Sequence, residues 1–403
     1  MTNPNPSAVE EQLARIEANA ETVLPREELA AKLGRALATG EPLRAKLGID
    51  PSAPHLTLGH AVVLRKLRTF QDLGHVAVLV VGDFTRLIGD PSGRSRTREP
   101  MSLDQVERNM RTYQEQAFRI LDPDRTEVRY NSEWLGKLSF GDLIALSARY
   151  TVARMLERDD FARRFQEGMP ITIMELLYPL AQAYDSVAVR ADVELGGSDQ
   201  RFNLLIGRDI QREYGQEPQV VLTMPLLIGT DGRFAMSQSR GNYIGIDEPP
   251  QEMFGKVMSL PDELVESYCR LLTDLPWGEV GVLAPKEGKK RMGEQIVAQF
   301  HGVEAAGAAR EHFERVFERG APPEDMPEVR LPAELVAADG SVQALDLVLA
   351  TGLVDSRSEA WRLCQQGGVQ VDGERITSAK ARIPFRPPAV VRLGRRRFVR
   401  FVA

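Results

Sequence analysis

Residues 46–60 read KLGIDPSAPHLTLGH, and no other run of this chain says as much about its architecture. The apolar pattern there predicts a strand over 44–49 that leads through a proline-containing turn into a helix over 58–70. The free N–H groups and the positive end of such a helix attract anions. The junction is therefore a candidate nucleotide-phosphate site, although an ordinary capped strand–helix junction fits the same pattern.

Strands and helices alternate outward from this stretch, which predicts a doubly wound parallel sheet of the Rossmann-like α/β class. The run VAVLVV at 76–81 is apolar throughout, as expected for a strand buried on both faces. Ligands of such sheets bind beyond the carboxyl ends of the strands, so the loops after Ile49, Phe84 and Leu195 are expected at one edge. The expected strands are 44–49, 76–84, 127–131, 192–195 and 220–227, and the expected helices are 58–70, 103–121, 140–150, 171–187 and 202–214.

The remainder of the chain divides by composition and periodicity. Residues 1–10 are expected as a disordered lead, with helices over 9–23 and 27–38. Towards the C-terminus, two short helices precede β-like stretches, which predicts a small α+β unit. The expected domains are a catalytic domain with N-terminal helices at 1–248, a helical domain at 249–325, a linker at 326–340 and a small C-terminal domain at 341–403.

Composition and charge narrow the class of protein. The net charge of the whole chain is −6, but its C-terminal segment is basic: from Ser341 onward it contains eleven Lys and Arg and five Asp and Glu. That tail indicates a polyanionic partner. Cys269 and Cys364 are far apart, which argues against a disulfide scaffold or zinc site and fits a reducing cytoplasm. No secretory pattern and no apolar run of transmembrane length is visible, so no membrane role is expected.

The expected helix over 171–187 carries polar residues on an otherwise apolar surface. Tyr178, Gln182 and Asp185 are separated by four and three positions and share one face. Buried polar groups are costly without partners, so a buried stripe of this kind would suit a small zwitterion with a polar tip. A solvent-facing stripe on an amphipathic helix is the alternative.

Three further loops carry candidate binding residues. Gly197-Ser198-Asp199-Gln200 follows an expected strand, where an acid can bind ribose hydroxyls or simply cap a helix. The loop 89–98 combines Gly, Asp90 and alternate arginines, which is typical of an anion clamp or of a solvated basic loop. The polar loop 232–242 has the composition of an ordinary surface loop.

Taken together, these motifs resemble the bacterial tyrosyl-tRNA synthetases, which are class I aminoacyl-tRNA synthetases. The resemblance runs from about residue 9 to the C-terminus. Residues 57–60 (TLGH) occupy the family's His-Ile-Gly-His position, and 235–239 (AMSQS) its Lys-Met-Ser-Lys-Ser position. The segments 89–93, 178–185 and 197–200 match the tyrosine enzymes closely, and the tail resembles their S4 RNA-binding fold. Lys46 indicates the second branch of these enzymes.

The resemblance implies a tyrosine site at Lys46, Asp90, Tyr178, Gln182, Asp185 and Gln200. Tyr178, Gln182 and Asp90 would hold the α-ammonium group, and Gln200 would contact the carboxyl side. Asp185 would accept from the phenolic hydroxyl and so reject phenylalanine. An unmatched buried polar partner is expensive, and tyrosyl-tRNA synthetases are themselves the standard example of this kind of discrimination.

The resemblance also implies ATP as a substrate, accompanied by Mg²⁺, with no dedicated metal site in the protein. The implied reaction forms tyrosyl-adenylate and passes the tyrosyl group to tRNA, mostly through positioning and phosphate-charge stabilisation. A homodimer is implied as well. The implied ATP-binding residues are Asp50, Ser52, Gly59, His60, Arg94, Asp199, Met236 and Gln238, and the implied catalytic residues are Thr57, His60, Ser237 and Gln238.

Three departures from the family pattern bear on activity. Thr57 replaces the first His, and Lys46 replaces a Tyr that touches the substrate hydroxyl in the commoner branch. Ala235 and Gln238 replace both lysines of the mobile loop, where removal of one transition-state interaction typically costs about 10²–10³-fold. The candidate replacements are arginines 94, 96, 98, 233 and 240.

Two other interpretations follow from these departures. One is an activation-impaired paralogue that binds tyrosine or tRNA without efficient adenylation. The other is a smaller adenylyltransferase, against which residues 249–403 argue because such enzymes need no RNA-binding appendage.

Overall fold

The computed structural model describes residues 6–51, 54–90, 111–318, 326–394 and 397–402. They form two compact units, 1–303 and 304–403, each described by itself. The division falls inside the helical stretch expected at 249–325. In the described residues no helix is long and apolar enough to cross a bilayer.

The first unit is built on a six-stranded sheet, and its parallel core confirms the predicted fold class. The strand order is β1-β6-β5-β2-β3-β4, with every pair parallel except β1 with β6. Strand order reverses between β2 and β5, which is where such sheets bind ligands. The strands are β1 (Thr22–Leu24), β2 (Arg44–Ile49), β3 (Val76–Val81), β4 (Thr126–Tyr130), β5 (Val193–Gly197) and β6 (Val220–Met224).

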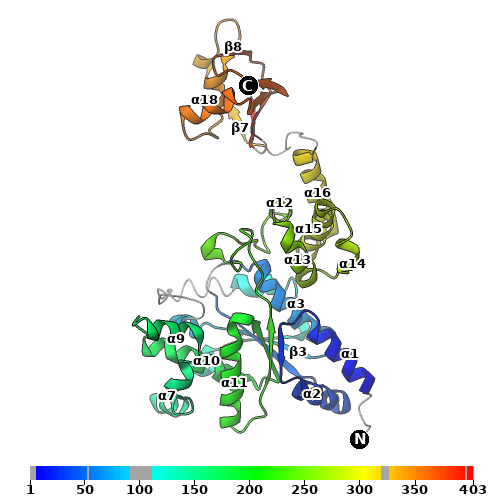
Figure 1. The fold of residues 1–403 in the computed structure, drawn as a ribbon, viewed down its shortest axis with the longest axis vertical. Helices are drawn as coiled ribbons and strands as arrows, with labels where there is room; N and C mark the ends of the chain where they lie inside the picture. The colour runs from blue at the N-terminus through cyan, green and yellow to red at the C-terminus, as the bar shows by residue number, and fades with distance from the viewer. Residues whose placement is uncertain (1–5, 52–53, 91–110, 319–325, 395–396, 403) are drawn as a thin grey trace. The chain divides into compact units, whose positions relative to one another are not determined.

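Helices cover both faces of this sheet. In Figure 1, α10 and α11 lie on one side of β3, and α1, α2 and α3 lie on the other. Residues 111–117 are also helical. The helices of this part are α1 (Pro6–Glu17), α2 (Arg26–Thr39), α3 (Leu58–Asp72), α4 (Thr85–Ile88), α6 (Ser132–Leu135), α7 (Phe140–Ser147), α8 (Val152–Met155), α9 (Asp159–Gln166), α10 (Ile173–Val189) and α11 (Arg201–Glu213), with short 3₁₀ turns η2 (Ser198–Gln200) and η3 (Gln238–Arg240).

The N-terminal expectations need correction. Residues 6–10, expected in a disordered lead, begin α1, while residues 1–5 lie outside the described part. The helix expected over 9–23 ends at Glu17, and β1 follows as an antiparallel edge strand on β6. Three residues are too few to show a strand period, and this strand exists only through its pairing with a distant partner.

The helix expected over 171–187 is α10, and its start is locally encoded. The Thr172 hydroxyl accepts from the Glu175 N–H at 3.3 Å, and the Glu175 carboxylate accepts from the Thr172 N–H at 2.9 Å. This reciprocal capping box satisfies two backbone donors at the helix start. Arg164 then pairs with the buried Glu175 at 2.8 Å, which ties α9 to α10.

After the sheet the chain is helical, as predicted for 249–317. Leu260, Tyr268, Ile296 and other apolar side chains of this part are buried. Helix α13 packs on α3 and α15, so these helices continue the first unit. They are α12 (Pro250–Met258), α13 (Val265–Leu272), α14 (Trp277–Val280) and α15 (Pro285–His301). The next helix, α16 (Val303–Phe313), belongs to the second unit from Glu304 onward.

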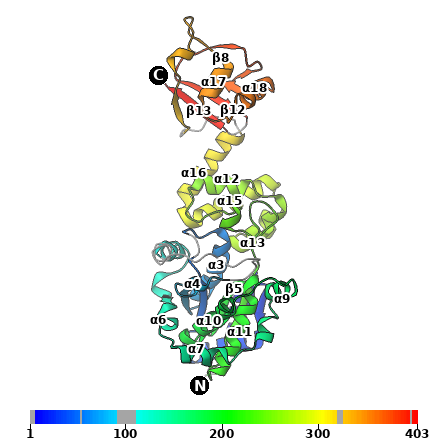
Figure 2. The same ribbon diagram turned by 90° about the vertical axis from the view of Figure 1, so that its left-hand side faces the viewer.

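The C-terminal unit has its own core, around Val348, Val391 and Phe401. Figure 2 shows β12 and β13 beside α17 and α18. Strand β7 pairs in parallel with β13, so part of the stretch expected as a linker, 326–340, belongs to this sheet. The elements are β7 (Glu328–Arg330), β8 (Ser341–Gln343), α17 (Ala344–Ala350), α18 (Arg357–Gln365), β9 (Val369–Val371), β10 (Glu374–Ile376), β11 (Arg382–Pro384), β12 (Ala389–Leu393) and β13 (Arg397–Val402).

Candidate functional site

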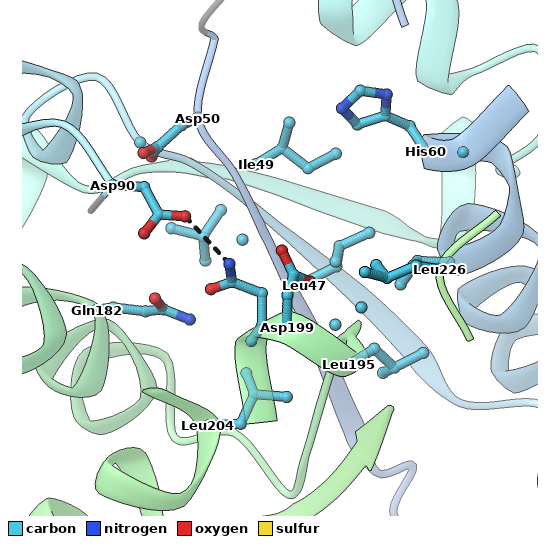
Figure 3. Close-up of a pocket in the computed structure, with 18 of the residues that line it drawn as sticks. Leu47, Ile49, Asp50, His60, Asp90, Gln182, Leu195, Asp199, Leu204 and Leu226 are labelled. Atoms are coloured by element: carbon cyan, nitrogen blue, oxygen red, sulfur yellow. Dashed lines mark hydrogen bonds between the residues drawn. The ribbon is translucent and has the colours of Figure 1, made fainter. Parts of the chain in front are cut away.

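A cavity of about 310 Å³ opens at the carboxyl ends of β2, β3 and β5, where the strand order reverses. In Figure 3, Asp90 and Gln182 lie at one end of the cavity and His60 at the other. The structure thus brings together polar side chains from loops that are far apart in the sequence. The sequence-predicted residues that line it are Asp50, Thr57, Gly59, His60, Asp90, Tyr178, Gln182, Asp185, Asp199, Gln200 and Met236.

The polar stripe of α10 faces this cavity. Tyr178 and Asp185 keep only 5% and 3% of their surface exposed, and Gln182 lines the cavity between them. The opposite face of the helix packs Leu180, Ala183 and Val187 into a hydrophobic cluster. The solvent-facing alternative is therefore wrong, because the stripe is buried against a space that a small polar molecule can fill.

Asp185 sits at the closed end of the stripe with two donors from outside it. The indole Nε1–H of Trp134 donates to Oδ1 at 2.8 Å, and the Asn131 amide donates to Oδ2 at 3.3 Å. Burial raises the pKa of Asp185 to about 7, an effect that nearby Lys46 and these two hydrogen bonds partly oppose. Asn131 and Trp134 were missed in the sequence. Their only signal was their place at the carboxyl end of the expected strand over 127–131.

The rest of the stripe and the loops beside it present hydrogen-bond acceptors. The side-chain Oε1 of Gln182 is buried and receives no hydrogen bond within the described part of the chain. The Gln200 amide donates to Asp90 Oδ2 at 3.0 Å, shown dashed in Figure 3. The Tyr178 hydroxyl donates to Asp50 Oδ2 at 2.9 Å, and burial followed by the Asp50 charge raises the pKa of Tyr178 well above its usual value. These oxygens suit an ammonium group.

The carboxylates of Asp50 and Asp199 pack closely against the backbone of two glycines at the strand ends. The Thr85 hydroxyl donates to Asp50 Oδ1 at 3.0 Å, and a Cβ on Gly82 would lie 2.0 Å from that same oxygen. A Cβ on Gly197 would lie 2.6 Å from Asp199 Oδ1. Burial, followed by the charge of Asp90, raises the pKa of Asp199. Glycine is thus required where these carboxylates pack on the backbone.

His60 is held in one tautomer at the start of α3. The Thr57 N–H donates to His60 Nδ1 at 3.1 Å, and the Thr57 hydroxyl lies 2.9 Å from the same nitrogen. Since Nδ1 accepts, the proton of the neutral ring resides on Nε2. Burial lowers the pKa of His60 to about 4, so the ring is neutral at pH 7 and offers one N–H donor. Thr57 therefore orients the histidine.

The loop after β6 contributes Ala235 and Met236 to the cavity wall. The Met236 N–H donates to the Leu227 carbonyl at 2.8 Å, which fixes this segment beside the site. Ser237 and Gln238, expected as catalytic, are not among the lining residues: the Ser237 hydroxyl contacts Ser239 at 2.9 Å, and the Gln238 amide donates to the His55 carbonyl. The Ser237 and Gln238 side chains therefore have hydrogen-bond partners outside the cavity.

Lys46, expected to touch tyrosine, also lies away from the cavity. It is fully buried, and its Nζ pairs with Glu194 at 2.9 Å and donates to Ser186 Oγ at 2.8 Å and to the Gln182 carbonyl at 3.1 Å. A buried ammonium needs such a set of acceptors, and two of them lie on α10 and the third on β5. Lys46 therefore supports the helix that carries the stripe.

The cavity wall is acidic. Among its described residues it carries the carboxylates of Asp50, Asp90, Asp185 and Asp199, and neither Lys nor Arg. Ser52 and the arginines at 94, 96 and 98 lie outside the described residues. No set of three or more His, Cys, Asp or Glu that could bind a metal occurs in the part of the chain that is described.

Comparison with known proteins gives the family directly. The family described as tRNA synthetases class I (W and Y) matches residues 38–318, and the S4 domain matches 345–385. A protein named tyrosine–tRNA ligase from Thermotoga maritima is 52% identical over 97% of both chains. Another of that name, from Geobacter sulfurreducens, is 50% identical over 98% of this chain and 99% of its own.

Solved structures agree on the fold. A truncated mitochondrial tyrosyl-tRNA synthetase from Aspergillus nidulans covers 77% of this chain and 97% of its own, with a TM-score of 0.64 at 21% identity. A tyrosyl-tRNA synthetase from Archaeoglobus fulgidus, complexed with L-tyrosine, covers 75% and 99%, with a TM-score of 0.60 at 23% identity. With a family match across most of its length and relatives at half identity, the chain belongs to the class I tRNA synthetases of the tryptophan and tyrosine group.

Proposed function

We propose that this protein activates L-tyrosine with ATP and transfers the tyrosyl group to the 3′ end of tRNA. The observation that carries the proposal is the buried stripe of Tyr178, Gln182 and Asp185 in the cavity at the reversal of strand order. The names of the relatives at half identity over nearly the whole chain point the same way.

The tyrosine would lie along α10. Its ammonium group would bind near Gln182 Oε1, Asp90 and Tyr178, because these acceptors gather at one end of the stripe. Its carboxylate would face Gln200. Its hydroxyl would donate to Asp185, which the donors on Trp134 and Asn131 hold in place. Bound phenylalanine has no hydroxyl to donate to Asp185. It would leave the buried acid without this hydrogen bond, which lowers the affinity for phenylalanine.

ATP would occupy the other end, near His60 Nε2–H, Gly59, Asp50, Asp199 and Met236. Because the described wall is acidic, the triphosphate needs a cation, and we propose Mg²⁺ held mainly by phosphate oxygens and water. The carboxylate oxygen of tyrosine attacks the α-phosphorus, and diphosphate leaves. The residues present would act by positioning both substrates and by donating to phosphoryl oxygens. Ser52 and Arg94 remain proposed ATP contacts. Gln238 is not proposed as a direct contact, because its side-chain amide donates to the His55 carbonyl.

The C-terminal unit would bind tRNA. It carries the basic excess found in the sequence and matches the S4 domain. Because β7 belongs to its sheet, a truncation should remove 326–403 rather than 341–403. We expect the truncated protein to keep tyrosine activation and to lose tRNA charging.

The protein would act in the cytoplasm as a homodimer. An apolar groove of about 410 Å³ lies between α4, α6, α7 and α10, beside Phe140 and Ile144, which are 78% and 56% exposed. Exposed apolar patches of this kind mark interaction sites, and we propose a second copy of the chain as the occupant. A Phe140→Asp, Ile144→Asp variant should sediment as a monomer where the wild type sediments as a dimer.

Tyrosine-dependent ATP–diphosphate exchange tests the proposed activity. We expect exchange with tyrosine and little with phenylalanine. An activation-impaired paralogue would bind tyrosine without exchange above background, and that result would overturn the proposal. Exchange without tRNA charging would point to the smaller adenylyltransferase instead.

A further inference from the structure

A compact cluster of two arginines and one phenylalanine stands on the loop that follows β6. Phe234 leaves 48% of its surface exposed. The guanidinium carbon of Arg240 lies 4.6 Å from the centre of its ring, and that of Arg233 lies 5.7 Å from it. Both arginines are exposed. We call Arg233, Phe234 and Arg240 the Arg–Phe–Arg cluster.

The loop holds its shape without these three side chains. The Asp231 carboxylate accepts from the N–H groups of Arg233 and Phe234, at 3.0 and 3.2 Å, and from the Asn242 amide at 2.9 Å. Asn242 in turn accepts from the Ser237 N–H at 2.8 Å. The carboxylate nearest the cluster is thus occupied by the loop itself.

The two guanidinium groups stay accessible. Among the described residues their closest printed partner is the Phe234 ring, and Arg240 adds a charge interaction that helps to lower the pKa of Asp231. A guanidinium group close to an exposed ring gains a modest cation–π attraction, so the three side chains stay together while the ring and both cations remain accessible to a ligand.

The cluster adjoins the cavity without lining it. Phe234 directly precedes Ala235, which lines the cavity, and its carbonyl accepts from the Gly229 N–H at 2.8 Å. The arginines are absent from the described cavity wall, so nothing in the geometry directs them at a bound triphosphate.

We propose that the Arg–Phe–Arg cluster binds the single-stranded 3′ end of the tRNA as it enters the cavity. The inference rests on the proposed function, which requires the terminal ribose to reach the adenylate. Single-stranded nucleic acid presents alternating bases and phosphates, and proteins bind it with aromatic stacking platforms flanked by cations. Phe234 supplies the platform, and Arg233 and Arg240 supply the phosphate contacts.

The test uses the full-length protein with three variants: Phe234→Leu, which keeps apolar bulk but removes the ring, Arg233→Gln with Arg240→Gln, and the control Arg35→Gln. Arg35 is a comparably exposed arginine on α2 that pairs with Glu217 at 2.7 Å. Each protein is assayed for tyrosine-dependent exchange, for tRNA charging, and for direct binding of tRNA with and without its unpaired 3′ nucleotides.

We expect Phe234→Leu to raise KM for tRNA about 5- to 150-fold, the range for removal of one stacked base. The double arginine variant should flatten the dependence of log affinity on log salt by about 0.7 for each phosphate that is no longer neutralised. Both variants should leave KM for ATP in the exchange assay unchanged, and Arg35→Gln should change nothing. Removal of the 3′ nucleotides should weaken binding to the wild type but not to the cluster variants.

Two outcomes would overturn the inference. An increase in KM for ATP in the double arginine variant would mean that these cations serve the triphosphate. Equal loss of affinity for truncated tRNA in the wild type and the cluster variants would mean that the 3′ end binds elsewhere. Absence of exchange in the wild type would instead reject the proposed function, and the binding comparison would still decide the role of the cluster.

Discussion

Replacing Asp185 by Asn tests two effects of this buried acid separately: its effect on folding stability and its part in selecting tyrosine. The side chain is almost wholly buried in the cavity wall, and burial raises its pKa from 3.8 to about 7. The charged form is therefore strained in the folded protein, even with donors from Trp134 and Asn131. The substitution keeps the shape of the side chain and removes the charge.

The size of the change in folding stability follows from the rise in the pKa of Asp185. A rise from 3.8 to about 7 corresponds to about 4 kcal/mol of free energy. Because the folded pKa lies above the unfolded one, the folded state binds the extra proton between these values. Wild-type stability from this group is complete below pH 4, falls as the pH rises to about 7, and stays low above it. The Asp185→Asn variant lacks this loss but its amide accepts fewer hydrogen bonds, so we expect a net gain of about 1 to 3 kcal/mol at pH 8.

Urea unfolding of the full chain at pH 5 and pH 8 measures this difference. The advantage of Asp185→Asn over the wild type should grow between the two values. The same variant should lose most of its preference for tyrosine over phenylalanine in the exchange assay. A direct check is the fluorescence of Trp134, whose indole contacts Asp185: it should titrate near pH 7 in the wild type and not in the variant.

Asp142→Asn is the matched control, because hydrogen bonds from Ser139 lower the pKa of this exposed carboxyl. Its stability relative to the wild type should fall as the pH rises through the acid range, the opposite sign. If the advantage of Asp185→Asn is the same at pH 5 and pH 8, or if the Trp134 signal shows no titration between pH 6 and 8, the reasoning about Asp185 is wrong.

Further substitutions test the neighbouring parts of the site. Restoring lysines by Ala235→Lys and Gln238→Lys should raise the exchange rate by up to about 100-fold, and an unchanged rate would show that cations outside the cavity wall already suffice. Lys46→Met should lower the free energy of unfolding by about 3 to 5 kcal/mol, because it leaves a buried carboxylate unpaired; a loss confined to KM for tyrosine would restore Lys46 to the substrate site. Thr57→Val removes a hydroxyl contact to His60 and should slow exchange about fivefold at constant KM for tyrosine, whereas a loss of tyrosine affinity would contradict the orienting role.

Much of the architecture could be predicted from the sequence, because it depends on local hydrophobic periodicity and composition. The apolar run of β3, the strand–turn–helix at 46–60 and the spacing of the polar stripe on α10 each encode their own geometry. Parallel strands end at one edge, so the meeting of their loops also followed without a structure. The cavity lined by Asp50, Asp185 and Asp199 follows from these rules.

Local patterns were therefore enough for the sheet, for the helix that carries the stripe and for the edge where ligands bind. The long-range partners came from the folded structure: Glu194 for Lys46, Trp134 and Asn131 for Asp185, and β13 for β7. The two kinds of information differ in the distance over which they act. Periodicity acts between neighbours, whereas the direction of a buried charge depends on which distant groups pack against it, and no local pattern records that choice.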